Sequence, residues 1–165
     1  MTVTRSATVT LPTDEQILIT REFDAPKELV FKAWTTPELV RRWWHANRGE
    51  MTVCEIDLRP GGAWRYVMVA SDGIEVGFHG VYREIVVGER LVSTEIYEGL
   101  PEGVSEDDGA TLNTATFDEQ HGRTLVTLLV QCANQLSRDA IIESGMENGL
   151  QDALDLLEQA AQSLR

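Results

Sequence analysis

Two short segments near the start of the chain alternate apolar and polar residues. Residues 6–11 (SATVTL) and 15–23 (EQILITREF) follow a period of two, which is typical of strands with one buried face. Pro12 and Asp14 between them favour a turn. The chain is therefore predicted to begin with β structure, residues 1–14 forming an N-terminal strand extension.

Two short helices are predicted after these strands. Asp24 and Pro26 stand before apolar residues that recur at the helical period, so that a carboxylate caps the first turn and the proline occupies a position without a hydrogen-bonding requirement. Thr36 and Pro37 repeat the arrangement before a second apolar group. Two helices separated by a break thus fill the gap before the next strands.

The middle of the chain reads as an antiparallel meander. Glycine-containing turn signals separate segments rich in β-branched and aromatic residues. Residues 99–110 (GLPEGVSEDDGA) show no periodicity and predict a long exposed loop. The six strands are predicted at residues 51–58, 63–71, 74–86, 90–98, 111–118 and 123–132.

The C-terminal segment predicts one long amphipathic helix over residues 137–162, with Ser137 as its N-cap. Such a helix must bury its apolar stripe, and a curved antiparallel sheet is the large partner that the chain offers. The predicted fold class is α+β, a helix grip in which the sheet wraps around the helix and leaves a cavity between them. Residues 1–165 are expected to form a single domain. The apolar stripe consists of Ile142, Met146, Gly149, Ala153, Leu157, Ala160 and Leu164.

Composition and charge exclude several classes of function. The chain has 42% hydrophobic and 25% charged residues and a net charge of −13, so nucleic acid and anionic membrane surfaces would repel it. The longest apolar run, residues 66–70, is far too short for a membrane span, and the N-terminus lacks the apolar core of a signal peptide. We expect a soluble, cytoplasmic protein in which Cys54 and Cys132 are reduced and buried.

Four stretches of the chain carry a resemblance to a known family. They are ITREFDAPKELVFKAWTTPELVRRWW (19–44), PGGAWRYVMVASDG (60–73), GVYREIVVGERLVSTE (80–95) and SGMENG (144–149). Together with the element order, they resemble the family named for the C-terminal domain of the heat-shock protein 90 ATPase activator, within the START-like (SRPBCC) superfamily. The resemblance implies the helix-grip fold. It also implies several functions, because this superfamily contains lipid carriers, hormone receptors, polyketide cyclases, antibiotic self-sacrifice proteins and co-chaperones.

Aromatic residues are the first candidates for a binding site. Trp34 and Trp43 are expected in the core, whereas Trp44 points about 100° away from Trp43 around the helix and is predicted at the mouth of the pocket. Trp64 is placed on the sheet wall.

The register of one hairpin brings a histidine into consideration. A two-residue turn at Asp72 and Gly73 would set Tyr66 opposite His79, with Trp64 on the same face. The imidazole would then be able to bind a ligand oxygen or act as an acid or base. The alternative is that this whole face is the solvated outer one.

Glu95 and Tyr97 share one face of a predicted strand. If that face lines the cavity, burial would raise the pKa of Glu95 and suit it to proton transfer. The alternative is a strand-edge carboxylate in water. His79, Glu95 and Tyr97 are therefore the candidate catalytic residues. No metal-ligand spacing or cofactor motif is visible, and His121 is expected in an exposed turn.

Two glycines in the predicted long helix call for an explanation. Gly145 and Gly149 stand one turn apart, where each costs about 1 kcal/mol relative to alanine. Either they leave room for a ligand, or they mark a kink or a tight crossing over a side chain such as Trp64. The predicted ligand-binding residues are Trp44, Trp64, Tyr66, His79, Glu95, Tyr97, Met146 and Gly149.

The leading functional hypothesis is a domain that binds a small, mostly apolar molecule between the C-terminal helix and the sheet. The first alternative is a polyketide-cyclase-like or hydrolase-like enzyme that uses the same cavity. The second is a co-chaperone-like module that docks on a heat-shock protein 90 chaperone through an acidic surface. A solvated face is the first interpretation of these acids. That surface comprises Glu102, Glu106, Asp107, Asp108, Asp139, Glu143, Glu147, Asp152, Asp155 and Glu158.

Overall fold

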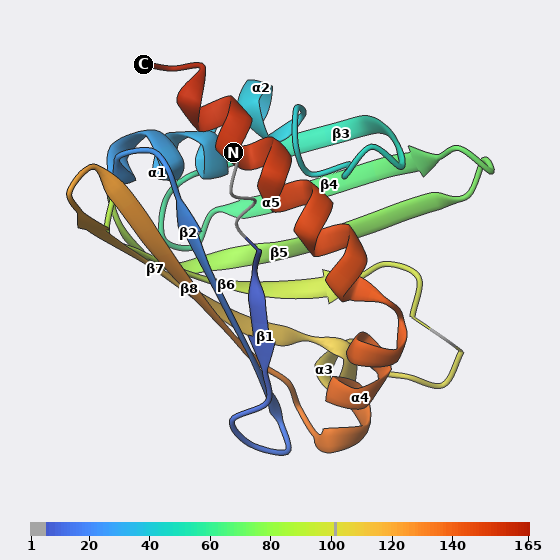
Figure 1. Cartoon of the computed structure of the whole chain (residues 1–165). Helices are drawn as coiled ribbons and strands as arrows, with labels where there is room; N and C mark the ends of the chain where they lie inside the picture. Colours follow the sequence, from blue (N-terminus) through green and yellow to red (C-terminus); the bar gives the residue numbers. More distant parts are fainter. Residues whose placement is uncertain (1–5, 101) are drawn as a thin grey trace.

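The computed structural model describes residues 6–100 and 102–165, so the first five residues of the predicted N-terminal extension lie outside the described residues. The order of elements confirms the predicted fold class: opening strands, two short helices, a six-stranded meander and C-terminal helices (Figure 1). The strands are β1 (Thr8–Thr10), β2 (Gln16–Phe23), β3 (Gly49–Ile56), β4 (Ala63–Ala70), β5 (Glu75–Val86), β6 (Arg90–Tyr97), β7 (Thr111–Gln120) and β8 (Arg123–Gln131). The helices are α1 (Lys27–Thr35), α2 (Pro37–Val40), α3 (Glu106–Gly109), α4 (Gln135–Glu143) and α5 (Met146–Gln162).

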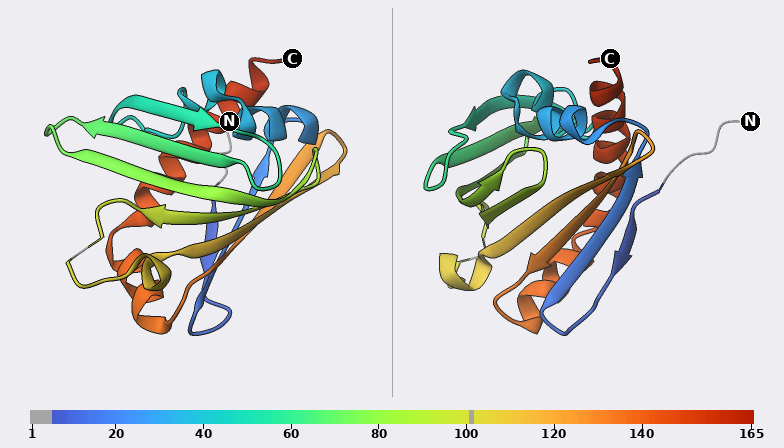
Figure 2. Two further views of the ribbon diagram at one scale, coloured as in Figure 1. Left: turned by 180° about the vertical axis from the view of Figure 1, so that it is seen from behind. Right: turned by 90° about the vertical axis from the view of Figure 1, so that its left-hand side faces the viewer.

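The strands form one antiparallel sheet in the order β1-β2-β8-β7-β6-β5-β4-β3. The chain therefore runs as a meander from β3 to β8, and the opening strands close the sheet by pairing β2 with β8. Figure 2 shows from two further sides that the sheet curves around α5, while α1 and α2 lie near the C-terminal end of this helix. This is the predicted helix grip.

The prediction of one unbroken helix over residues 137–162 is wrong. α4 ends at Glu143 and α5 begins at Met146, because Gly145 adopts a left-handed conformation with φ of 79°. Glycine reaches this region without steric cost, so it commonly terminates helices. The predicted N-cap is also wrong: Asn134 caps α4, its side chain accepting a hydrogen bond from the backbone N–H of Ser137.

Three other local features differ from the prediction. The segment 99–110 contains a single helical turn, α3, which Ser105 caps by accepting a hydrogen bond from Asp108 N. Pro26, not Asp24, occupies the N-cap of α1. Thr36 does stand at the N-cap of α2, but its side chain makes no capping bond.

The core lies between the concave face of the sheet and α1 and α5. Phe23, Phe117 and Leu157 are almost completely buried there. Phe31 of α1 packs edge-on against Phe117, with 5.3 Å between ring centroids. Cys54 and Cys132 are buried and unpaired.

An ion pair attaches α5 to the sheet beside this core. Arg21 of β2 is 3% exposed, and its Nη1 donates to Asp155 Oδ1 of α5 at 2.6 Å. A second carboxylate, that of Glu158, lies 3.7 Å from Nη2 of the same guanidinium. The helix is thus held in position by both apolar burial and charge.

No helix within the described ranges is long and apolar enough to cross a membrane.

Candidate functional site

A pocket of about 410 Å³ lies between α5, the segment around α2 and the concave face of the sheet. Its size falls within the range of small-molecule sites, which is roughly 300–1,000 Å³. The walls are mostly apolar, and eight Phe, Trp and Tyr side chains contribute to them: Phe23, Trp34, Trp43, Trp44, Trp64, Tyr66, Phe78 and Tyr82.

Trp44 and Tyr66 form the centre of an aromatic cluster at this pocket. Their ring centroids are 5.5 Å apart, and Trp44 also approaches Phe78 at 5.7 Å. Trp43 occupies a different environment, as predicted, although α2 ends at Val40 and both tryptophans lie in the turns that follow it rather than in the predicted helix. It is 6% exposed, and its Nε1 donates to Ala33 O. Trp44, which is only half-buried, thus presents its ring to the pocket while Trp43 fixes the chain to α1.

A glycine on the neighbouring strand allows the Trp64 side chain to adopt its position. Gly80 pairs with Trp64 in the β4–β5 ladder. The indole lies across this glycine, and its Nε1 donates to Thr94 O on β6 at 3.1 Å. A Cβ atom at Gly80 would lie 1.8 Å from Thr94 O and 2.7 Å from Trp64 Nε1. The absence of a side chain at Gly80 therefore brings the Trp64 ring close to β6, where it packs against Tyr66 at 4.8 Å between ring centroids.

Glu95 is the carboxylate that lines the pocket. Its Oε2 accepts a hydrogen bond of 2.9 Å from Asn113 Nδ2 on β7. Burial raises the pKa of Glu95, and the Asn113 bond opposes this shift in part. The oxygen of the Asn113 amide accepts from the hydroxyl of Thr111, which orients the amide nitrogen toward Glu95.

Two buried phenols, those of Tyr66 and Tyr82, line the same pocket. Burial and the neighbouring Tyr82 raise the pKa of Tyr66 well above its usual range, and the charge of Glu95 adds to the increase. Burial likewise raises the pKa of Tyr82 to about 12, although its bond with Tyr66 acts in the opposite direction. Both phenols are therefore neutral hydrogen-bonding groups near pH 7.

His79 is not in the pocket, and the predicted hairpin register is wrong by one residue. Arg65, not Tyr66, pairs with His79, because the turn between β4 and β5 has three residues rather than two. Gly73 occupies its left-handed position, with φ of 86°, and Ala70 N donates to Ile74 O across it. A shift of one position moves a side chain to the other face of a strand, so Trp64 and Tyr66 face α5 while His79 faces outward.

The structure brings together six of the eight predicted binding residues. The two that do not line the pocket are His79 and Tyr97. Tyr97 is 39% exposed and packs against Phe78, with 5.1 Å between ring centroids. The six that line the pocket are Trp44, Trp64, Tyr66, Glu95, Met146 and Gly149. Their role in binding a ligand stays a prediction.

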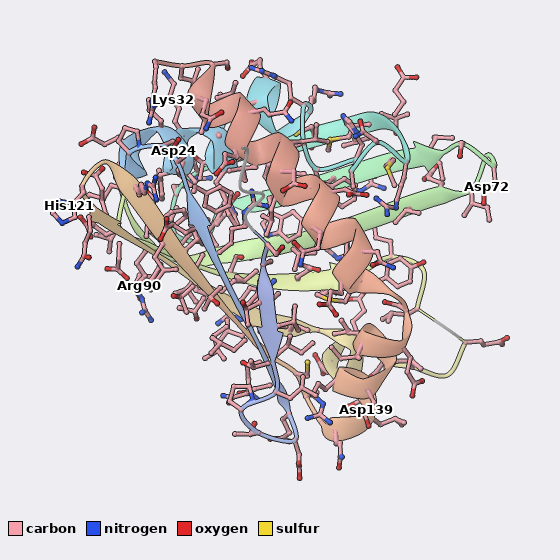
Figure 3. The ribbon with its side chains drawn as sticks, viewed as in Figure 1. Asp24, Lys32, Asp72, Arg90, His121 and Asp139 are labelled. Carbon is pink, nitrogen blue, oxygen red and sulfur yellow. The ribbon has the colours of Figure 1, made fainter. Side chains whose placement is uncertain are left out.

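Five polar residues of the pocket were not predicted from the sequence: Arg21, His45, Arg48, Ser93 and Asn113. Arg21 lies at an inward position of β2, in phase with Ile19 and Phe23, and this placement of a basic residue was a signal that could have revealed it. Asn113 carried no such signal, because its orientation depends on the pairing of β7 with β6 and β8. The remaining histidine of the turns, His121, lies at the exposed tip of the β7–β8 hairpin, as expected (Figure 3). Within the described part of the chain, no group of three His, Cys, Asp or Glu side chains is placed to hold a metal ion.

The fold and the pocket together define a START-like helix-grip domain. A family model described as "Activator of Hsp90 ATPase homolog 1-like protein" matches residues 24–162, and the chain belongs to this family. None of the curated proteins compared with this chain matches it.

Solved structures share the fold. A protein from Rhodobacter sphaeroides has 25% sequence identity and a TM-score of 0.85, with 97% of this chain and 100% of that chain covered. A protein from Mycobacterium smegmatis has 22% identity and a TM-score of 0.81, covering 93% and 95% of the two chains. The AHSA1-like protein from Aeromonas hydrophila has 22% identity and a TM-score of 0.66, covering 89% and 93%. These likenesses extend over nearly the whole chain.

Proposed function

We propose that the protein binds a small, mostly apolar molecule in the pocket between α5 and the sheet. The observation that carries this proposal is a cavity of about 410 Å³ with aromatic walls and few polar groups. Removing apolar surface from water provides the driving force, and flat rings stack favourably on Trp and Tyr side chains. The volume accommodates a molecule of two or three rings.

Dye binding tests the proposal. N-phenyl-1-naphthylamine, whose emission rises in apolar surroundings, should bind with a single saturable site and change the tryptophan fluorescence, because Trp44 and Trp64 line the pocket. A Gly149→Leu variant should weaken the dye by roughly tenfold, because an apolar side chain would project into the cavity from α5.

Asn148→Leu is the matched control for this variant. Asn148 is the exposed neighbour of Gly149 on α5 and points about 100° away from it. The control should bind the dye as the wild type does. Equal affinity of wild type and Gly149→Leu, or no saturable binding, would contradict the proposal.

An enzyme that transfers a proton in the same pocket is the second candidate. The observation in its favour is Glu95, a pocket-lining carboxyl group whose pKa is raised by burial. Hydrolysis of an aryl ester such as p-nitrophenyl acetate, compared in wild type and Glu95→Gln, tests it. Equal rates in the two proteins would exclude Glu95 as the proton donor or acceptor in that reaction.

Docking on a chaperone stays a prediction, and the name of the family is its support. The acids concerned lie on α4, α5 and the segment that contains α3; Asp139 marks the α4 part of this surface in Figure 3.

A further inference from the structure

Glu95 has one carboxylate oxygen engaged and one available. Asn113 Nδ2 binds Oε2, and Oε1 has no hydrogen-bond partner among the described residues. The Glu95 side chain is only partly exposed, and it lines the pocket. An ionised carboxylate in such a place is costly unless a partner offsets the loss of water.

The other formal charges at the pocket already have counter-ions. Arg21 is paired with Asp155 at 2.6 Å, and Arg48 with Asp152 at 2.9 Å. Among the Arg and Glu side chains that line the described pocket, Glu95 alone lacks an ion pair. The pocket therefore contains one unbalanced negative charge.

Aromatic rings flank this charge. Trp64 reaches β6 through its bond to Thr94 O, the residue next to Glu95. Tyr66 packs against Trp64 and is close enough to Glu95 for the carboxylate to influence its pKa. A carboxylate with Trp and Tyr side chains nearby is an arrangement that attracts an ammonium group, because an aromatic ring and an anion both attract a cation.

We propose that the molecule bound in this pocket carries a basic nitrogen, and that its ammonium group pairs with Glu95 beside Trp64 and Tyr66. This proposal rests on the proposed function and adds the polar group of the ligand. The N–H of the ammonium donates to Oε1 of Glu95, while the apolar part of the molecule fills the aromatic pocket. The net charge of −13 also favours a cationic ligand, because this protein attracts cations and repels anions.

A matched set of three probes tests the proposal: 2-(1-naphthyl)ethylamine, 2-(1-naphthyl)ethanol and 1-ethylnaphthalene. All three present the same two-ring body, and they differ in carrying an ammonium group, a hydroxyl group or neither. Isothermal titration at pH 7 should give the amine an affinity about tenfold or more above that of the alcohol, because a hydrogen bond to a charged partner is the stronger interaction. 1-Ethylnaphthalene should bind no better than the alcohol.

Two variants assign the preference to Glu95. Glu95→Gln should remove the advantage of the amine and leave the affinity for 1-ethylnaphthalene unchanged. Glu84→Gln is the control, because it removes the same charge from an exposed residue of β5 that pairs with Arg90 outside the pocket. This variant should retain the full preference.

The outcomes separate the two proposals. Binding of all three probes with equal affinity, or an amine preference that survives in Glu95→Gln, would overturn the ammonium site and leave the apolar pocket standing. Failure of all three probes and of N-phenyl-1-naphthylamine to bind would overturn the proposed function itself.

Discussion

His79 Nδ1 lies 2.8 Å from Oε2 of Glu98, on the face of the sheet that is turned away from α5. Arg65 holds the same carboxylate with two hydrogen bonds of 2.9 Å. Gly77 leaves the space that Glu98 occupies, since a Cβ atom there would lie 2.7 Å from Oε1. The histidine that the sequence suggested for the pocket thus belongs to an outer-face network that joins β4, β5 and the end of β6.

The pKa of Glu98 predicts how this network responds to acid. The bonds from Arg65, followed by that from His79, lower the pKa of Glu98 from 4.5 to about 2. A carboxyl group whose pKa is lower in the folded state stabilises the fold above its unfolded pKa, and this contribution is lost as the pH falls through the folded value. Glu98→Gln should therefore be less stable than wild type at pH 6, and the difference should decrease between pH 4.5 and 2. Urea unfolding at four pH values checks this, and a difference that is constant with pH would contradict it.

Gly145 and Gly149 should respond to alanine with opposite signs. No atom lies within 4 Å of a Cβ at Gly149, so the tight crossing over Trp64 considered from the sequence is absent. Gly149→Ala should raise the free energy of unfolding by about 1 kcal/mol through helix propensity, while the added methyl group weakens dye binding. Gly145→Ala should lower it by about 1–2 kcal/mol, because its φ of 79° is unfavourable for any residue with a Cβ. Thermal melts of the two variants with and without dye decide, and a destabilised Gly149→Ala protein would refute this assignment.

Gly80→Ala should lower the free energy of unfolding more than Gly145→Ala does. Its methyl carbon would overlap Thr94 O and displace the Trp64 ring. Overpacking typically costs about 1–3 kcal/mol, and we expect the upper end of this range because the clash is with a backbone oxygen. We expect loss of stability together with loss of dye binding, measured by denaturant unfolding and fluorescence. Gly73→Ala on the same hairpin is the comparison, since it is strained only by its φ of 86° and meets no atom within 4 Å.

The ion pair of Arg21 with Asp155 should contribute more than a surface pair. Asp155→Asn leaves a guanidinium that is 3% exposed with only the more distant Glu158, and we expect a loss of about 2 kcal/mol. Asp152→Asn breaks the exposed pair with Arg48 and should cost less than about 1 kcal/mol. If urea unfolding gave the same loss of stability for Asp155→Asn and Asp152→Asn, burial of Arg21 would not strengthen its ion pair, which would contradict the prediction.

The sequence was sufficient for the fold because its signals are redundant. The opening strands show the period of two, and turn residues separate the strands of the meander, so an error of one or two positions at the end of a strand leaves the topology unchanged. The same applies to the aromatic wall: Trp64 and Tyr66 share a phase, and so they occupy one face whichever face that is.

Prediction of the site depended on single residues, for which the sequence contains no second signal. Asp72-Gly73 suits a two-residue turn, but Ser71 joins the observed loop, and this one position moved His79 to the outer face. The apolar stripe continues through Gly145, so periodicity alone could not reveal that α4 and α5 are separate helices. The amide of Asn113 meets Glu95 across two strands, a contact that no local pattern encodes.

The bond from Trp64 to Thr94 fixes a pocket wall before any ligand arrives. The indole is confined by the backbone at Gly80 and by its own hydrogen bond, so its rotamer is set when the sheet folds. Ordering a mobile side chain on binding costs about 0.5–1.5 kcal/mol of conformational entropy, and here that cost falls on folding rather than on the ligand. This wall of the pocket is therefore pre-ordered and rigid. It should bind molecules that match its shape and exclude larger ones, because it does not adapt to them.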